Sequence, residues 1–178
     1  MNLSENKNPN LSNEKFWYAF YTKSRHEFKA EMDFESFGLE HYLPTITRLK
    51  QWSDRKKKVT EPLFKGYIFA KVNEYERGIA IKSDAIVNTV MFNGEAAHVQ
   101  DFQIANLKRL LDKNPKVFVT DKIEIGAHVV INSGPFEGIE GVVFTNDNDD
   151  SMLAISCDLL KRSVVVRLPA KDVKKLTY

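Results

Sequence analysis

The sequence predicts an α+β protein in which an antiparallel sheet flanked by helices is followed by a small all-β barrel. Strand-like and helix-like segments alternate as far as residue 113, which favours helices packed on one sheet. Asn114-Pro115 then stops the last helix. Beyond it only short apolar runs occur, separated by turns rich in Gly, Asp and Asn. We therefore expect a disordered leader (1–15), a main domain (16–113), a linker (114–122) and a barrel domain (123–178).

The first elements of the main domain follow from local signals. "FWYAFY" (16–21) is short and aromatic-rich, as in a buried strand. Ser24, with Glu27 three positions later, resembles a capping box, which predicts that a helix starts there. Gly38 predicts its end, because glycine readily takes the left-handed conformation after a last turn. A short strand over 40–45 is broken by Pro44.

The rest of the main domain is predicted from turns and periodicity. Residues 46–64 form two strand-like runs around "SDR", which indicates a β-hairpin. "GYIFAKV" (66–72) is the most strand-like segment, and Asn93-Gly94 is a strong hairpin-turn signal. Further elements are a short helix over 74–82, a strand over 86–92 and an amphipathic helix over 101–113.

Several aromatic residues are expected on one face of the sheet. Alternation over 66–72 puts Tyr67 and Phe69 on one face and Ile68 with Ala70 on the other, which the helices would cover. Tyr21 and Phe64 would extend the aromatic face. Two interpretations stay open: an exposed patch that binds a partner, or a second covered face in which every aromatic residue is core.

The predicted hairpin is strongly basic. Residues 48–58 hold six basic side chains and one acidic one, a local net charge of +5 against +2 for the whole chain, with Trp52 at the tip. Lysines beside an aromatic ring can hold phosphates and stack a base. The alternative is a solvated hairpin whose charge prevents edge-to-edge aggregation. Lys23, Arg25 and His26, at the start of the first helix, could extend the basic surface.

Other functional classes find little support. No apolar run is long enough to cross a membrane, and the polar start lacks the apolar middle of a signal peptide, so we expect a cytoplasmic protein with no membrane partner. The single Cys157 cannot form an internal disulfide. The four histidines lie in different elements without metal-ligand spacing, and no phosphate-binding or nucleophile motif is present. We therefore predict no enzymatic activity, cofactor or metal.

Three stretches together resemble the NusG family of transcription elongation factors. "FWYAFYTKSRHEFKAE" and "EPLFKGYIFAKV" resemble its N-terminal NGN domain, and "GAHVVINSGPFEGIEGVVF" resembles its KOW motif. The resemblance implies an NGN-like sheet domain followed by an SH3-like barrel. "EPLF", "SML" and "QWSDRKKKV" are closer to the specialised RfaH and UpxY antitermination proteins, the latter associated with capsular polysaccharide operons. Lys65 departs from the family, which often has proline there.

The resemblance implies specific contacts. In the family, an apolar depression on the NGN sheet docks on the clamp helices of the largest RNA polymerase subunit and suppresses pausing. The matching residues are Tyr21, Phe64, Tyr67 and Phe69. Lys23, His26 and Lys29 match positions where specialised members meet non-template DNA. To these we add Arg55, Lys56 and Lys57 of the basic hairpin as candidates for contact with non-template or upstream DNA.

The resemblance also implies partners for the predicted barrel. In the family it binds a ribosomal protein or the termination factor Rho, and in RfaH it can refold as a helical hairpin that masks the docking patch. Here the valine run at 164–166 favours strand, so we expect a barrel. KOW barrels also occur in ribosomal proteins, which leaves a ribosome-associated or RNA-binding module as the alternative function.

Overall fold

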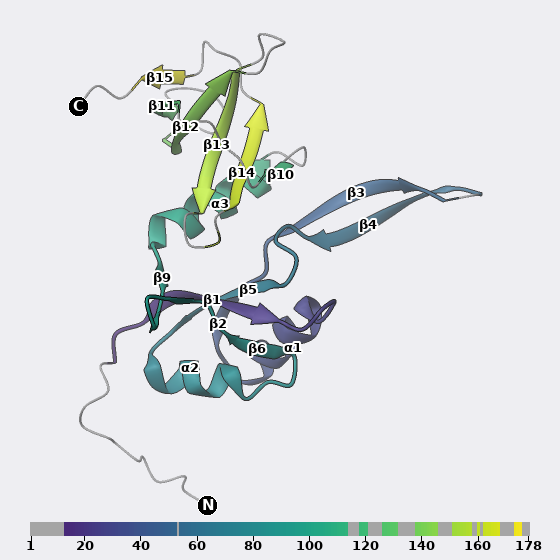
Figure 1. The fold of residues 1–178 in the computed structure, drawn as a ribbon. Helices are drawn as coiled ribbons and strands as arrows, with labels where there is room; N and C mark the ends of the chain where they lie inside the picture. The colour runs from purple at the N-terminus through teal and green to yellow at the C-terminus, as the bar shows by residue number, and fades with distance from the viewer. Residues whose placement is uncertain are drawn as a thin grey trace, which may run out of the picture.

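The chain is a mixed α/β protein built on two main antiparallel sheets. The computed structural model describes residues 13–52, 54–113, 118–120, 126–131, 138–145, 151–157, 160, 162–167 and 173–175. The described residues contain three α-helices, and Figure 1 shows the first sheet with its helices below the second sheet. The predicted leader over 1–15 lies largely outside the described residues.

The first sheet has β1 (Phe16–Thr22) and β5 (Tyr67–Val72) at its centre. The strand order is β2-β5-β1-β6, where β2 is Glu40–Tyr42 and β6 is Ile86–Thr89, and β9 (His98–Val99) also pairs with β1. In the antiparallel register of β1 and β5, Tyr21 lies opposite Tyr67. The pairing of β1 with β6 shifts between Tyr21 and Thr22, which marks a β-bulge at the end of β1.

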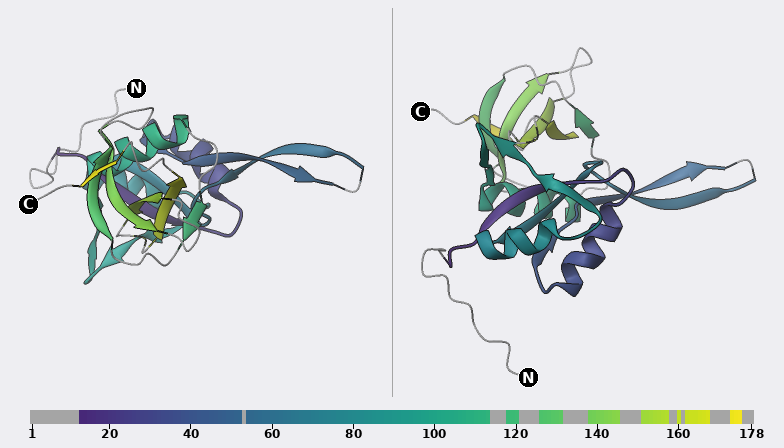
Figure 2. Two further views of the ribbon diagram at one scale, coloured as in Figure 1. Left: turned by 90° about the horizontal axis from the view of Figure 1, so that it is seen from above. Right: turned by 60° about the horizontal axis from the view of Figure 1, so that its bottom comes forward.

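Two helices cover one face of this sheet. Helix α1 (Glu27–Ser36) and helix α2 (Glu74–Ile81) lie below the strands in the right-hand view of Figure 2. Their buried side chains pack with Ile68 and Ala70 of β5, as alternation predicted. The end of α1 also matches the prediction. Gly38 has a φ of +69°, and the Leu39 N–H donates to the Phe34 carbonyl at 3.0 Å, which is a Schellman motif.

The start of α1 differs from the prediction. The helix begins at Glu27, the N-cap position is His26, and no side chain caps it. Ser24 lies in the preceding turn. The Glu27 carboxylate instead accepts a hydrogen bond from the Gly66 N–H at 2.7 Å. The Glu27 carboxylate is therefore bound to a residue 39 positions away in sequence, and the helix start has no capping box.

A long hairpin leaves the body of the protein. Strands β3 (Thr45–Gln51) and β4 (Lys56–Pro62) pair with each other along their whole length and with no other described strand. The hairpin extends well beyond the two sheets in Figure 1 and in both views of Figure 2. A second, small hairpin of β7 (Met91–Phe92) and β8 (Glu95–Ala96) turns at Asn93-Gly94, both with positive φ, as predicted.

The C-terminal part forms a six-stranded antiparallel sheet. Its order is β10-β14-β13-β12-β11-β15. The strands are β10 (Phe118–Thr120), β11 (Ala127–Ile131), β12 (Glu140–Thr145), β13 (Ser151–Cys157), β14 (Arg162–Arg167) and β15 (Val173–Lys175). Since β10 pairs with β14, residues 118–120 belong to this sheet and not to the linker predicted over 114–122. The acidic loop at 146–150 lies outside the described residues.

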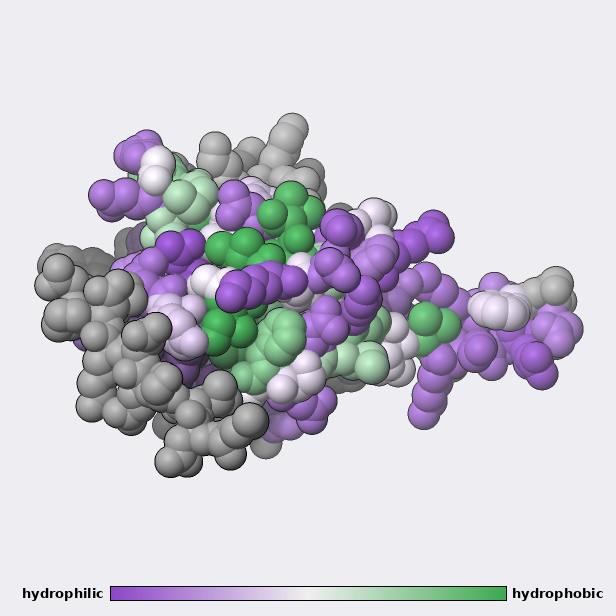
Figure 3. Space-filling view, turned by 90° about the horizontal axis from the view of Figure 1, so that it is seen from below, coloured by the Kyte–Doolittle hydropathy of each residue, from purple (hydrophilic) through white to green (hydrophobic). Residues whose placement is uncertain are grey.

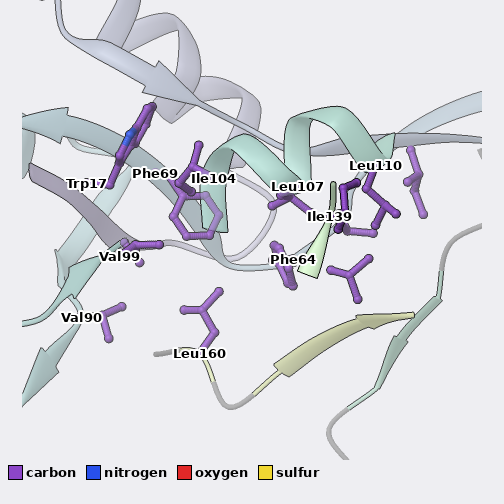
Figure 4. Close-up of a cluster of buried hydrophobic side chains, with 14 of the residues drawn as sticks. Trp17, Phe64, Phe69, Val90, Val99, Ile104, Leu107, Leu110, Ile139 and Leu160 are labelled. Atoms are coloured by element: carbon purple, nitrogen blue, oxygen red, sulfur yellow. The ribbon is translucent and has the colours of Figure 1, made fainter. Parts of the chain in front are cut away.

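Helix α3 (Asp101–Lys113) lies between the two sheets (Figure 1). Its buried side chains Ile104, Leu107 and Leu110 belong to one hydrophobic cluster with residues of both sheets. Figure 4 shows Leu110 of α3 and Ile139 beside one another, with Phe64 and Leu160 in the same cluster. The face of the first sheet opposite α1 and α2 is therefore also covered.

Candidate docking face and nucleic-acid interface

The structure brings the four predicted aromatic residues together in two pairs. The rings of Tyr21 and Tyr67 lie 5.0 Å apart between centroids, on the paired strands β1 and β5. Phe64 and Phe69 meet nearly edge to face at 6.0 Å. The turn at 64–67 links the pairs, since the Tyr67 N–H donates to the Phe64 carbonyl at 3.3 Å. We call these four residues the aromatic face.

Half of the aromatic face is closed to solvent. Phe64 and Phe69 are both 0% exposed, so the expectation of an open patch is wrong for them in this structure. For these two residues the other interpretation, a second covered face of the sheet, is correct. Tyr67 is half-buried and Tyr21 is 40% exposed, so both tyrosines reach solvent at the edge. Burial of the phenylalanines contributes about 1.5–3 kcal/mol each.

The cover over Phe64 and Phe69 comes from distant parts of the chain. Helix α3 contributes Leu107 and Leu110, and the C-terminal part contributes four buried side chains to the same cluster. The four are Val129, Ile139, Leu160 and Val164. We call these four residues the C-terminal cover (Figure 4 labels Ile139 and Leu160). Sequence reasoning missed their role, because nothing local indicates that they pack on the first sheet.

A basic side chain borders the covered face. The ammonium of Lys108 lies 5.1 Å from the Trp17 ring centroid and 5.0 Å from that of Tyr42, a cation–π arrangement with both. Burial raises the pKa of Tyr42 to about 12, because the phenolate form is poorly solvated there. Lys108 therefore helps to hold α3 against β1 and β2.

The basic hairpin is exposed along its length. Arg48, Lys50 and the run from Arg55 to Lys58 are all exposed, and hydrophilic side chains dominate the hairpin in Figure 3. Trp52, 49% exposed, lies at the tip with the Lys57 ammonium 5.1 Å from its ring centroid. Lys50 also forms an ion pair with Glu61, and the Lys50 hydrogen bond lowers the pKa of the Glu61 carboxyl. The tip combines an aromatic ring with positive charge, the pair of features that single-strand binding uses.

The two predicted groups of nucleic-acid-binding residues lie at opposite ends of the hairpin. Arg55, Lys56 and Lys57 are at the tip. Exposed Lys23 and Lys29 and partly buried His26 are at the start of α1, near the base of β4. A seven-residue strand spans about 23 Å, so the structure does not bring the two groups together. One ligand could contact both only if it followed the hairpin.

Two kinds of site are absent from the described part of the chain. No group of three or more His, Cys, Asp or Glu side chains there is arranged to hold a metal ion. None of the helices in the described part is long and apolar enough to cross a membrane.

Comparison with known proteins identifies the family. The model of the NusG family, described as transcription termination factor nusG, matches residues 15–108. The chain belongs to the NusG family. The matched region includes β1 to β9 and the aromatic face, together with most of α3. This is a family of transcription termination and antitermination factors, and not of enzymes.

Full-length relatives agree with this NusG assignment at low identity. The chain is 25% identical to the transcription termination/antitermination protein NusG of Borreliella burgdorferi, with 90% of this chain and 98% of the relative covered. It is 23% identical to the protein of that name from Rickettsia typhi, over 92% of each chain. A solved structure titled "Domain interaction in Thermotoga maritima NusG" superposes with a TM-score of 0.52, at 24% identity, and covers 92% of this chain and 98% of that one. This likeness supports the NusG fold.

Proposed function

We propose that this NusG-family protein is an antitermination and elongation factor that binds RNA polymerase through the aromatic face. The single observation that carries the proposal is the pairing of Tyr21 with Tyr67 beside Phe64 and Phe69, because aromatic side chains are the usual anchors of protein interfaces. The partner we propose is the clamp helices of the largest polymerase subunit. The result would be suppression of pausing or termination, with no chemistry by this chain.

The proposal requires the C-terminal cover to move. With Phe64 and Phe69 fully buried, only the tyrosine edge is available to a partner in the described state. Apparent affinity falls in proportion to the population of the open state, so closure reduces binding without changing the contact itself. We propose that polymerase first meets Tyr21 and Tyr67 and that separation of the two sheets then exposes the phenylalanines. The "Domain interaction" title of the Thermotoga maritima structure is consistent with a contact of this kind.

Nucleic acid is the second proposed partner. The exposed charge and Trp52 of the hairpin favour contact with non-template or upstream DNA near the polymerase. We propose Arg55, Lys56 and Lys57 for the tip contact, and Lys23, His26 and Lys29 for a separate contact at the start of α1. The resemblance to RfaH and UpxY extends the proposal to a cytoplasmic factor for a polysaccharide biosynthesis operon.

The C-terminal sheet would then serve as an SH3-like KOW barrel. Its six strands pair as consecutive neighbours in one antiparallel sheet, from β10 at one end to β15 at the other. When it leaves the aromatic face, a ribosomal protein or Rho is the proposed partner of the released surface.

The test is a pull-down against core RNA polymerase followed by a pausing assay on a leader template. Tyr21→Ala combined with Tyr67→Ala should weaken polymerase binding at least tenfold, because both side chains reach solvent and can be removed without a large core cavity. Phe69→Ala is the poorer probe, since truncating a fully buried phenylalanine costs about 3–5 kcal/mol of stability. Tyr75→Ala, which removes a 65% exposed tyrosine from α2, is the matched control. Unchanged binding by the double variant would rule out the aromatic face.

The exposed hairpin favours a second candidate, a ribosome-associated or RNA-binding module. Binding of RNA that survives the tyrosine double variant, combined with no retention by polymerase, would support this second function. A salt titration distinguishes the two further, because a plain RNA binder loses affinity steeply as phosphate contacts are screened.

A further inference from the structure

A hollow of about 520 Å³ lies between helix α3 and the connection from β2 to β3. Its volume falls within the range of about 300–1,000 Å³ that small-molecule sites occupy. One wall is the C-terminal half of α3, and the other is the segment in which β2 ends and β3 begins. The residues proposed for polymerase and for nucleic acid are not among those that line it in the described chain. We call it the α3 hollow.

Part of the lining is apolar. Leu43 is 5% exposed, and Tyr42 and Leu111 are partly buried. The side chains of Tyr42 and Leu111 also pack against the hydrophobic cluster that covers the aromatic face. A hydrocarbon group placed in the hollow would therefore extend this cluster and leave water. The apolar lining favours an organic ligand over a hydrated inorganic ion.

The charged side chains of the lining favour an anion with a single charge. Lys108 and Arg109 carry two positive charges and Asp112 one negative charge, so the lining has a net charge of +1. The Lys108 ammonium lies about equally far from the Trp17 and Tyr42 ring centroids, at 5.1 and 5.0 Å. Within the described chain no carboxylate forms an ion pair with this ammonium. A carboxylate would balance the lining, whereas a phosphate with two charges would also meet repulsion from Asp112.

The hydroxyl of Tyr42 supplies a hydrogen-bond donor beside this ammonium. Burial raises the pKa of Tyr42 to about 12, so the phenol stays protonated at neutral pH. Among the described residues this hydroxyl has no hydrogen-bond partner. The Thr45 hydroxyl belongs to the same wall. A carboxylate can accept from an ammonium and a phenol together, and hydrogen bonds to a charged acceptor are the stronger kind.

Arg109 connects the hollow with the C-terminal part of the chain. Its Nη1 and Nη2 atoms both lie 3.8 Å from the position that a Cβ atom on Gly138 would take. Gly138 directly precedes Ile139 of the C-terminal cover. The guanidinium therefore lies between the α3 hollow and the segment that closes the aromatic face. A ligand paired with Arg109 would act on that contact.

We propose that the α3 hollow binds a small monocarboxylate with an apolar body, and that this ligand stabilises the closed arrangement of the two sheets. The carboxylate accepts from Lys108 Nζ and the Tyr42 hydroxyl, with Arg109 as the second cation, and the body lies on Leu111. Stabilising the closed state lowers the population that can bind polymerase, so the ligand reduces polymerase affinity. That last consequence rests on the proposed docking of polymerase, and the binding site itself does not.

The first test is a titration of the isotope-labelled full-length protein with phenylacetate, followed by amide NMR shifts. The dissociation constant should be about 1 mM or tighter, as expected for a ligand of this size. The neutral isostere phenylacetamide should bind at least tenfold more weakly, and the dianion phenyl phosphate should also bind more weakly than phenylacetate. The largest shifts should occur at Thr45 and Leu111. Equal affinity for acid and amide, or shifts centred elsewhere, would overturn the site.

Tyr42→Phe is the decisive variant. It keeps the ring under the Lys108 ammonium and removes only the hydroxyl, so phenylacetate should bind about tenfold more weakly while the Tm of the free protein does not fall. Tyr75→Phe, at a 65% exposed position on α2, is the matched control and should leave binding unchanged. Lys108→Gln should lose more affinity, but it also removes the contact that holds α3. Unchanged binding by Tyr42→Phe would rule out the carboxylate position.

Hydrogen exchange tests the closure without polymerase. Amides of β5 should exchange more slowly when phenylacetate saturates the protein, because the covered state becomes more populated. Unchanged exchange at saturation would overturn the stabilisation of the closed state.

The proposal and the docking on polymerase fail separately. Polymerase retention in the pull-down should fall when phenylacetate is added, and Tyr42→Phe should reduce this effect. If the Tyr21 and Tyr67 double variant still binds polymerase, the docking proposal is wrong, and the titration and exchange measurements decide the α3 hollow on their own.

Discussion

Phe64 and Phe69 meet nearly edge to face with ring centroids 6.0 Å apart, and neither ring is accessible to solvent. Leu160, from a part of the chain some hundred residues further on, lies in the same cluster (Figure 4). The side chains best suited to anchor a large partner are thus also the core of a contact between the two parts of this protein. The proposed docking on polymerase and the stability of the closed state therefore depend on the same two rings.

Weakening the C-terminal cover should increase polymerase binding. Leu160→Asp places a charge in the cluster, where an unpaired carboxylate is strongly disfavoured, so the closed state becomes less populated. We expect apparent polymerase affinity to rise at least tenfold. Val87→Asp, at a 61% exposed position on β6, is the control. Affinity that stays constant, with hydrogen exchange showing increased opening around Phe64, would contradict the proposed closure.

Charge removal at the hairpin tip should change the salt dependence of nucleic-acid binding. Replacing Lys56 and Lys57 by Gln removes two phosphate contacts, so the slope of log K against log salt should fall by about 1.5–2. Trp52→Ala should weaken single-strand binding by about 1–3 kcal/mol with little change of slope, because stacking is not a charge interaction. Fluorescence titrations over a salt series measure both quantities. A slope unaffected by the lysine changes would place the nucleic acid elsewhere.

Acid should weaken the contact between Glu74 and Arg77. Arg77 Nη2 lies 2.5 Å from Glu74 Oε2, and this hydrogen bond holds the pKa of the Glu74 carboxyl below its ordinary value. The contribution to stability is therefore present above that ordinary value and is lost as the pH falls through the lower pKa of the folded state. Arg77→Met should flatten the rise of the unfolding free energy over the acid range in which Glu74 titrates, by less than about 1 kcal/mol because the pair is partly exposed.

Urea unfolding at a series of pH values measures this effect. Arg77→Lys, which keeps a charge, is the control and should retain part of the pH dependence. Identical curves for Arg77→Met and the natural sequence would show that the ion pair contributes nothing measurable.

The capping side chain of α2 should contribute more to the free energy of unfolding than any single side chain at the start of α1. Asn73 accepts a hydrogen bond from the Glu76 N–H at 2.9 Å, and Glu76 accepts one from the Asn73 N–H at 3.1 Å, a complete capping box. Asn73→Ala should cost about 1 kcal/mol of unfolding free energy. Ser24→Ala should cost close to nothing, since Ser24 does not cap α1. A larger loss from Ser24→Ala would contradict the observed helix start.

The sequence predicted features that depend on neighbouring residues. Gly38 and Asn93-Gly94 have the positive φ that their turns require, and the alternation of Ile68 with Phe69 assigns the two sheet faces correctly. The predicted start of α1 was wrong. Ser24 does not cap the helix, and Glu27 binds Gly66, a partner that no local pattern reveals. The start of the C-terminal sheet was also placed too late, since Phe118–Thr120 resembles linker until β14 pairs with it.

The covering of the aromatic face could not be predicted either, because it depends on contacts between distant parts of the chain. Alternation shows that Phe64 and Phe69 leave the α1 side of the sheet, but not which residues meet them. The cover comes from α3 and from Ile139 and Leu160, whose position depends on how two sheets pack in space. The hydroxyl of Thr22 is buried without a hydrogen-bond partner in the described residues, and this too has no signal in the sequence, because threonine in a strand is ordinary.

Gly66 joins the start of α1 to the aromatic face. Its N–H donates to the Glu27 carboxylate, its carbonyl accepts from the Thr22 N–H, and its neighbour Tyr67 belongs to the aromatic face. A nucleic acid bound at the proposed contact at the start of α1 would act on the same hydrogen bonds that hold the turn before Tyr67. Binding of nucleic acid and binding of polymerase would then be coupled, and each partner would change the affinity for the other by the same factor.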